Sequence, residues 1–261
     1  MNTSTQKTTA EKSVALRALH VPGNPLIVTN VWDAITARTV AAVPGVKALA
    51  TASHAVSFAR GVPDGEGLTV DQALEAARII TSAVELPVSV DFERGYAISL
   101  SQLHDNIGRL VEAGAAGLNI EDSTADKSLF ARDEAAARVA AVRAADKHIV
   151  INARADGLVR GASFDEVVER ANSYLDAGAD CIFVLGLTTE DLVARAIDEI
   201  AGKVSVVSKP TSVPLARLAE LGVARVSFGP GTLGLTLSHL QQAAAQLTAR
   251  GDYPAELGFS Y

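Results

Sequence analysis

The 261-residue chain is poor in cysteine, in aromatic residues, in basic charge and in long apolar runs. Its single cysteine, Cys181, allows neither a disulfide framework nor a paired-cysteine metal site. Aromatic residues make up 5% of the chain, which is few for a surface that stacks on bases or sugars. The net charge of −7 argues against nucleic acid as a partner, because binding to a phosphate backbone needs a basic face.

Signals for membranes and for secretion are also missing from the sequence. No apolar run approaches the ~20 residues that a transmembrane helix needs, so we expect no membrane association. Residues 1–12 are polar and lack the apolar core of a signal peptide, which favours a cytoplasmic location. The length suits one barrel domain of ~250 residues. We therefore expect residues 1–261 to form a single domain, with residues 1–20 as a polar N-terminal tail and lead-in.

Short apolar, β-branched runs recur along the chain and alternate with Ala- and Leu-rich stretches of helical spacing, which predicts βα units and a parallel sheet. The expected strands cover residues 26–30, 47–51, 87–91, 117–121, 149–154, 180–184, 204–208 and 225–228. Eight such units in ~250 residues indicate an α/β fold of the (β/α)8, or TIM barrel, type. The alternative is a doubly wound sheet, whose usual ~6 strands would leave part of this pattern unexplained.

Acidic side chains close two neighbouring expected strands, where a barrel of this kind has its active site. Asp91 and Glu93 end the third strand and share a face if the strand continues through both, and Glu121 ends the fourth. Converging carboxylates need a cation, and oxygen ligands favour Mg²⁺, with Mn²⁺ as a second possibility. Zn²⁺ is disfavoured because no His or Cys lies on that rim. The alternative is that these carboxylates are solvated loop residues.

Three other residues at or near strand ends have more than one interpretation. Arg154 could bind a substrate carboxylate or phosphoryl group, or it could form a salt bridge to a neighbouring acid. Lys209 could form a Schiff base, although an electrostatic role on the rim is favoured. Cys181, inside the sixth strand, is expected to be a small buried hydrophobe rather than a nucleophile.

Several motifs together resemble the isocitrate lyase / phosphoenolpyruvate mutase superfamily, and in particular its phosphoenolpyruvate mutase-like branch. In chain order they are Asn30-Val31-Trp32-Asp33-Ala34, Gly61-Val62-Pro63-Asp64, Pro87-Val88-Ser89-Val90-Asp91 with Gly95-Tyr96, Gly117-Leu118-Asn119-Ile120-Glu121-Asp122-Ser123, Ile151-Asn152-Ala153-Arg154 and Gly178-Ala179-Asp180-Cys181-Ile182-Phe183-Val184. The match covers residues 25–235 and keeps the order and spacing of the family.

The resemblance implies a Mg²⁺-dependent barrel that acts on a small 2-oxo acid through a metal-stabilised enolate. Such an enzyme makes or breaks a P–C or C–C bond, as a phosphoenolpyruvate/phosphonopyruvate mutase does, or as a hydrolase or decarboxylase of oxaloacetate or phosphonopyruvate does. The resemblance further implies a homotetramer, a dimer of dimers, in which the last helix, residues 232–250, swaps between subunits.

The resemblance also implies roles for residues at matching positions. Four acids are expected at the metal, namely Asp91 as the direct ligand and Asp64, Glu93 and Glu121 as the acids that hold its waters. Substrate binding is expected from Trp32, Ser53, His54, Lys127 and Arg154. The catalytic residues are expected to be Asp64, Ser53, His54 and Arg154. The segment around Ser53 would act partly through backbone N–H groups, and the loop over residues 123–132 would close over the site.

The chain also departs from the family pattern. The lyase branch carries a cysteine as proton donor in the loop after the fourth strand, whereas this loop reads Ser123-Thr124-Ala125-Asp126-Lys127-Ser128. After the sixth strand, Leu185 and Gly186 stand where the mutase branch has polar residues. Two alternatives to the enzyme described above therefore stay open: a C–C lyase of the isocitrate or methylisocitrate type with a proton donor other than cysteine, and a catalytically silent barrel that binds metal and ligand.

Overall fold

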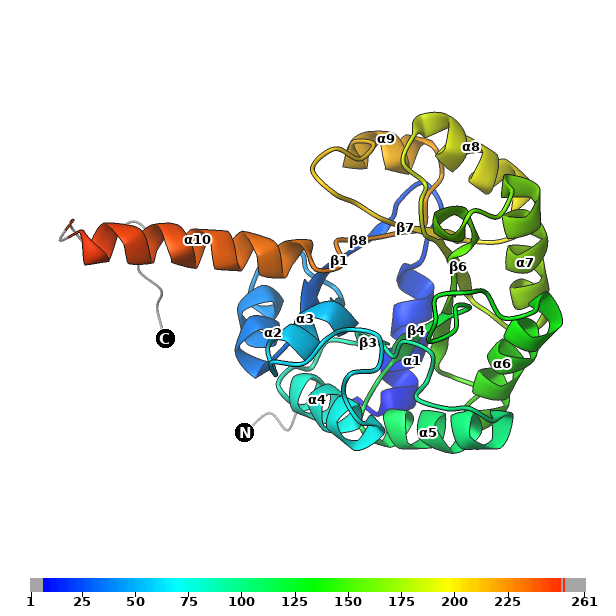
Figure 1. The fold of residues 1–261 in the computed structure, drawn as a ribbon, viewed down its shortest axis with the longest axis horizontal. Helices are drawn as coiled ribbons and strands as arrows, with labels where there is room; N and C mark the ends of the chain where they lie inside the picture. Colours follow the sequence, from blue (N-terminus) through cyan, green and yellow to red (C-terminus); the bar gives the residue numbers. More distant parts are fainter. Residues whose placement is uncertain (1–6, 250, 252–261) are drawn as a thin grey trace.

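The structure is a computed structural model that describes residues 7–249 and Gly251. Eight parallel strands pair in chain order and close into a barrel, with β8 beside β1 (Figure 1). The strands are β1 (Leu26–Val31), β2 (Leu49–Thr51), β3 (Val88–Asp91), β4 (Gly117–Glu121), β5 (Val150–Ala155), β6 (Cys181–Val184), β7 (Val204–Val207) and β8 (Arg225–Ser227). This closure confirms the predicted (β/α)8 barrel and excludes the doubly wound sheet, which would be open.

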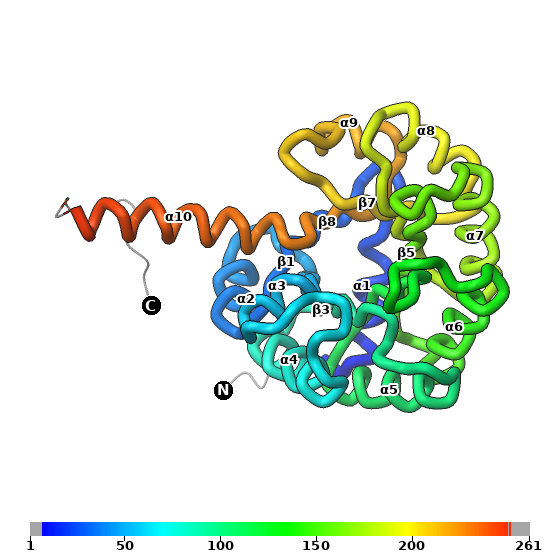
Figure 2. The backbone as a smooth tube through the Cα atoms, in the orientation of Figure 1, coloured from blue at the N-terminus to red at the C-terminus, as the bar shows by residue number. Residues whose placement is uncertain are grey.

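Most helices follow the strands and form the outer ring that is seen end-on in Figure 2. The helices are α1 (Thr9–Leu19), α2 (Ala34–Ala41), α3 (Ser53–Phe58), α4 (Val70–Ser82), α5 (Leu100–Glu112), α6 (Arg132–Ala145), the 3-10 helix η1 (Gly157–Arg160), α7 (Phe164–Asp176), α8 (Glu190–Glu199), α9 (Leu215–Glu220) and α10 (Gly231–Thr248). Among the helices of the described residues, none is long and apolar enough to cross a membrane.

Side chains along each strand point alternately to the outside of the barrel, where the helices pack, and to its interior. In β5, Ile151 and Ala153 are buried in the large cluster shared with the helices, whereas Val150 joins the smaller cluster at the base of the barrel. Asn152 and Arg154 have the same parity as Val150, so they point into the barrel. Asn152 there donates a hydrogen bond to the side chain of Asn119 on β4 at 2.8 Å. The same parity along β3 and β4 directs Asp91 and Glu121 inward at the carboxyl ends.

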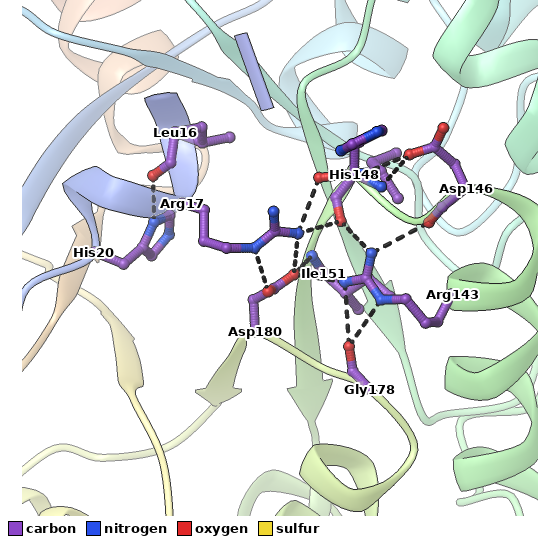
Figure 3. Close-up of polar contacts among 10 residues, drawn as sticks. Leu16, Arg17, His20, Arg143, Asp146, His148, Ile151, Gly178 and Asp180 are labelled. Atoms are coloured by element: carbon purple, nitrogen blue, oxygen red, sulfur yellow. Dashed lines mark hydrogen bonds and ion pairs between the residues drawn. The ribbon is translucent and has the colours of Figure 1, made fainter. Parts of the chain in front are cut away.

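Helix α1 closes the end of the barrel opposite the carboxyl ends of the strands. The expected lead-in over residues 1–20 contains this helix, which Thr8 caps and whose Leu16 is fully buried at the base; residues 1–6 lie outside the described part. Arg17 donates to Asp180 with Nε–Oδ1 at 2.6 Å, and Arg143 donates to the same carboxylate at 2.7 Å from the other side (Figure 3). These ion pairs fasten α1 and α6 to the start of β6.

Helix α10 leaves the barrel and projects away from it (Figure 1). In an ordinary barrel the helix after the last strand covers the outer side of β8 and β1. Here that side is left partly open, and Ile27 on β1 is 40% exposed. A largely apolar groove of about 780 Å³ runs between the start of α10 and the barrel, with Leu215, Phe228 and Leu235 in its lining.

Candidate active site

The acids that the sequence predicted at the third and fourth strand ends do converge. Asp91 pairs in register with Asn119, two residues before Glu121, and the backbone N–H of Glu121 donates to the carbonyl of Glu93 at 2.9 Å. One expectation needs correction, because β3 ends at Asp91 and does not continue through Glu93. Glu93 has a left-handed backbone with φ at 48°, and this turn, rather than strand alternation, brings its side chain inward.

The Asp91 carboxylate is only half satisfied. Its Oδ2 accepts a hydrogen bond from the backbone N–H of Ser53 at 2.9 Å. Its Oδ1 is buried and has no hydrogen-bond partner. A buried carboxylate oxygen without a donor is strongly disfavoured unless a ligand or an ion completes its environment.

Glu93 is 1% exposed and is held by two donors. The Tyr96 hydroxyl donates to its Oε1 at 2.8 Å, and the backbone N–H of Glu66 donates to its Oε2 at 2.5 Å. Burial raises the pKa of Glu93 to about 7, and the nearby charges of Asp91 and Asp64 add to this rise. Glu93 is therefore close enough to Asp91 and to Asp64 for their charges to repel it.

Arg154 lies between two carboxylates at the top of β5. Its Nη1 donates to Glu121 at 2.5 Å, and its Nε and Nη2 form a two-pronged contact with Asp156 at 2.6 and 2.9 Å. Asp156 is fully buried and also accepts from the Ser123 hydroxyl at 2.8 Å. Burial raises the pKa of Glu121, the charge of Asp91 adds to the rise, and Arg154 opposes it. The predicted salt bridge of Arg154 is thus present, and its binding of substrate stays a prediction.

The residues expected near the substrate lie around β1 and β2. Ser53 opens helix α3 and is 8% exposed, and its backbone N–H donates to Asp91. The Trp32 N–H donates to the Thr36 hydroxyl at 3.2 Å. Both amides have partners within the chain, and the contribution of backbone N–H groups near Ser53 to substrate binding stays a prediction. His54 lies on α3, and its Nδ1 is 3.8 Å from Asp64 Oδ2, with both side chains partly exposed.

The loop after β4 is a small folded hairpin. Ser123 forms an antiparallel bridge with Leu129, and the Asp126 carboxylate accepts from the hydroxyl groups of Thr124 and Ser128. These hydrogen bonds lower the pKa of Asp126 to about 2. Lys127 is exposed at the tip with φ at 69°. Lys127 therefore lies at the tip of a hydrogen-bonded turn.

Cys181 and Lys209 are placed differently with respect to solvent. The Cys181 thiol is fully buried, and burial raises its pKa to about 12, so it is neither accessible nor ionised at neutral pH. This agrees with its interpretation as a small buried hydrophobe. Lys209 is exposed beyond the end of β7, beside the groove at α10.

Sequence reasoning missed three residues that bind predicted site residues directly: Asp156 binds Arg154, and Tyr96 and Glu66 bind Glu93. Asp156 could have been found, because it follows Arg154 by two residues and so shares its side of the chain. Tyr96 stands in a quoted motif but was given no role. Glu66 lies in the long connection after β2, where no periodicity predicts which side chains turn inward.

The geometry defines the class of the protein as a (β/α)8 barrel with an acidic site at the carboxyl ends of its strands. More acidic than basic side chains lie at this rim. Five carboxylates, Asp64, Asp91, Glu93, Glu121 and Asp156, surround or approach one rim, and Arg154 pairs with two of them. In the part of the chain that the structure describes, no three His, Cys, Asp or Glu side chains form a ready-made shell of direct metal ligands. A cation at this rim would therefore keep part of its water shell.

Comparison with known proteins agrees with this class. The family model "Phosphoenolpyruvate phosphomutase" matches residues 16–248, and the chain belongs to this family, within the phosphoenolpyruvate mutase/isocitrate lyase superfamily. A crystal structure described as a putative phosphonomutase from Burkholderia cenocepacia is 38% identical with a TM-score of 0.87, covering 91% of this chain and 99% of that one.

Two curated relatives show how broad the superfamily is. An uncharacterised protein of Mycobacterium tuberculosis is 36% identical over 225 residues, covering 83% of each chain. The 2-methylisocitrate lyase of Escherichia coli is 31% identical over 229 residues, covering 82% of this chain and 76% of its own. Mutase, hydrolase and decarboxylase enzymes also occur among the relatives. The chain is thus similar to enzymes of several reaction types.

Proposed function

We propose that this protein is a Mg²⁺-dependent enzyme that makes or breaks a P–C or C–C bond of a small 2-oxo acid. The observation that carries the proposal is the half-satisfied Asp91 carboxylate, with a buried Oδ1 that has no partner, beside Glu93 and Glu121. Relatives named as a phosphonopyruvate hydrolase, a phosphoenolpyruvate phosphomutase and an oxaloacetate decarboxylase support this substrate class.

The residues present fit a hard divalent cation. Asp91 Oδ1 would offer one direct oxygen ligand, and Asp64, Glu93 and Glu121 would accept hydrogen bonds from coordinated water. Mg²⁺ suits this arrangement because it gives up its water reluctantly and is often held by one or two carboxylates. Mn²⁺ accepts the same ligands. A bound ion of this kind would act as a Lewis acid on the 2-oxo group of the substrate.

The chain's own residues supply orientation and exclusion of water. Arg154 is held rigidly by Asp156 and Glu121, and its remaining N–H groups could bind a carboxylate or phosphoryl oxygen. His54 lies on α3 after β2, and Lys127 lies on the hairpin after β4, two strands further around the barrel, where both could contact the distal part of a substrate. Closure of that hairpin would keep water from the reacting carbon.

A panel of candidate substrates with and without Mg²⁺ tests the proposal. Phosphonopyruvate and phosphoenolpyruvate would be followed by ³¹P NMR, and oxaloacetate by release of pyruvate. The panel also includes 2-methylisocitrate, which represents the lyase alternative. We expect turnover of at least one 2-oxo acid that stops when EDTA is added. Binding of Mg²⁺ and oxalate in calorimetry without any turnover would favour the silent barrel, and the absence of both would contradict the proposal.

We also propose a homotetramer in which α10 packs on another subunit. The helix carries Leu235, Leu237 and Leu240 at 73%, 49% and 62% exposure, which is unfavourable for an isolated helix in water. The partly open side of β1 and the groove beside Leu215 and Phe228 offer an apolar surface that a helix from a second copy could cover. Exchange of the helix between subunits would bury both surfaces at once.

Replacement of both Leu235 and Leu240 by Asp should reduce the oligomer to a smaller species. Two buried charges in an apolar helix interface would each be strongly disfavoured, so the measured mass should fall by at least half. Light scattering after size-exclusion chromatography measures this mass directly. Ile98→Asp is the matched control, because Ile98 is 97% exposed on a different loop and its replacement should leave the mass unchanged. A wild-type protein that elutes as a monomer would refute the tetramer.

A further inference from the structure

Three residues beside the acidic rim share an unusual backbone conformation. Glu66, Glu93 and Tyr96 have φ values of 63°, 48° and 52°, a left-handed region that residues other than glycine rarely adopt. They belong to two separate connections, because Glu66 lies between α3 and α4 whereas the other two follow β3. Such conformations persist only where the surroundings enforce them, and they gather at functional sites.

Hydrogen bonds join these three residues into a closed ring. The backbone N–H of Glu66 donates to Glu93 Oε2 at 2.5 Å, and the Tyr96 hydroxyl donates to Glu93 Oε1 at 2.8 Å. The backbone N–H of Tyr96 then donates to Glu66 Oε1 at 2.8 Å. The left-handed turns are what allow both amides to point at side chains of the other connection.

Arg94 completes the environment of Glu66. Its Nη2 donates to Glu66 Oε2 at 2.8 Å and to the carbonyl of Gly65 at 3.2 Å. The side chains of Arg94 and Glu66 are 12% and 19% exposed, so this ion pair is sheltered from solvent. Both oxygens of the Glu66 carboxylate are therefore held by groups that follow β3.

These contacts fasten the connection that carries Asp64. Glu66 follows Asp64 by two residues, and Gly67 leaves no room for a side chain, because a Cβ there would lie 2.1 Å from the Pro63 carbonyl oxygen. The segment from Pro63 to Gly67 is thus a tight turn, and Glu66 is the residue through which it binds Glu93 and Tyr96. A change at Glu66 would shift Asp64 relative to Asp91 and Glu93 without touching any of the three acids.

We propose that Glu66 is a positioning residue, whose carboxylate locks the Asp64 turn onto Tyr96 and Arg94 and so sets the spacing of the acids around the cation. This inference rests on the proposed function, since it assumes that these acids hold the water shell of Mg²⁺ or Mn²⁺. It concerns a residue that itself contacts neither the ion nor the substrate. Outer residues of this kind commonly contribute 10- to 100-fold to metal affinity.

The experiment measures Mn²⁺ affinity by titration calorimetry and the melting temperature of the metal-free protein. Glu66→Ala removes both side-chain interactions and should weaken Mn²⁺ binding about tenfold. Glu66→Gly also lacks the carboxylate but suits a φ of 63°, so its affinity should fall equally while its melting temperature falls less. Glu66→Gln keeps an acceptor for the Tyr96 N–H and loses only the ion pair, so it should restore most of the affinity.

Glu75→Ala is the matched control, because it removes an exposed Glu–Arg pair with Arg78 on α4 and should leave Mn²⁺ affinity unchanged. Wild-type affinity in Glu66→Ala and Glu66→Gly, whatever their melting temperatures, would overturn the positioning role while leaving the proposed function intact. If Glu66→Ala fails to fold, Glu66→Gly against Glu75→Ala decides the same question. A wild-type protein that binds no Mn²⁺ would instead refute the proposed function, and the positioning role with it.

Discussion

Replacement of Asp91 by asparagine should abolish activity and leave the fold intact. The asparagine side chain can still accept the hydrogen bond from the Ser53 N–H, but it lacks the charged oxygen that would bind the cation directly. Because Lewis-acid stabilisation supplies several kcal/mol and each ~1.4 kcal/mol is a factor of ten, we expect kcat/KM to fall by about a thousandfold or more. The affinity for Mn²⁺ in calorimetry should fall with it.

The stability of the metal-free Asp91→Asn variant should not fall, although its activity and its metal affinity do. The Asp91 charge raises the pKa values of Glu93 and Glu121, so its removal relieves repulsion among buried acids. We therefore expect the metal-free variant to melt at the same temperature as the wild type or higher. Asp71→Asn is the control, since Asp71 is 76% exposed at its side chain and pairs with Arg109 on the outer ring. Full activity in Asp91→Asn would exclude this carboxylate as the metal ligand.

Replacement of Arg154 by methionine should destabilise the protein by about 3 kcal/mol at neutral pH. The change removes the counter-ion of Glu121 and the nearer counter-ion of Asp156, which is fully buried and keeps Arg160 at 4.0 Å. Breaking a buried pair by removing one partner is costly. Chemical unfolding in the presence of EDTA measures the free energy without interference from metal. Activity should be lost as well, because the group expected to bind the substrate is gone.

The pH dependence of this destabilisation tests whether its cause is the loss of a counter-ion for Glu121. Burial already places the pKa of Glu121 above its unfolded value, and loss of Arg154 removes the group that opposes the rise. The folded variant then binds more protons than the unfolded chain, so its stability falls as the pH rises. We expect a larger loss at about pH 8 than at about pH 5. Arg78→Met, which removes an exposed pair with Glu75, should change the free energy of unfolding by at most ~0.5 kcal/mol at either pH.

The barrel could be predicted from the sequence because its signals are local and repeated. Apolar strands recur at regular distances, and Gly114 and Gly178 each follow a helix with a positive φ, as expected for a residue just past a helix end. Helix α1 was missed because its buried side comprises few apolar residues, and Lys12 lies on it beside Leu16. Lys12 donates to the carbonyl of Val84, a contact 72 residues away that no local pattern reveals.

The candidate site could be predicted only as far as strands place its residues. Asp91, Glu121 and Arg154 close strands, so their convergence follows from barrel geometry. Glu93 and Glu66 lie in turns, where a left-handed backbone decides the direction of the side chain, and alternation carries no information there. The hydrogen bond from the Ser53 amide to Asp91 joins α3 to β3, and no local pattern in the sequence predicts this pairing.

The closure of the base of the barrel by helix α1 has a consequence for the order of folding. Arg17 and its partner Asp180 are 163 residues apart, and β1 must also wait for β8 to complete its pairing. During synthesis α1 emerges before the strands, yet its docking surface is complete only after β5 and β6 have formed. Contacts this distant in sequence are slow to form, because the intervening chain must be ordered before they are gained. Helix α1 therefore reaches its place late although it precedes every strand of the barrel in the chain, and until then its Leu16 is available to other surfaces.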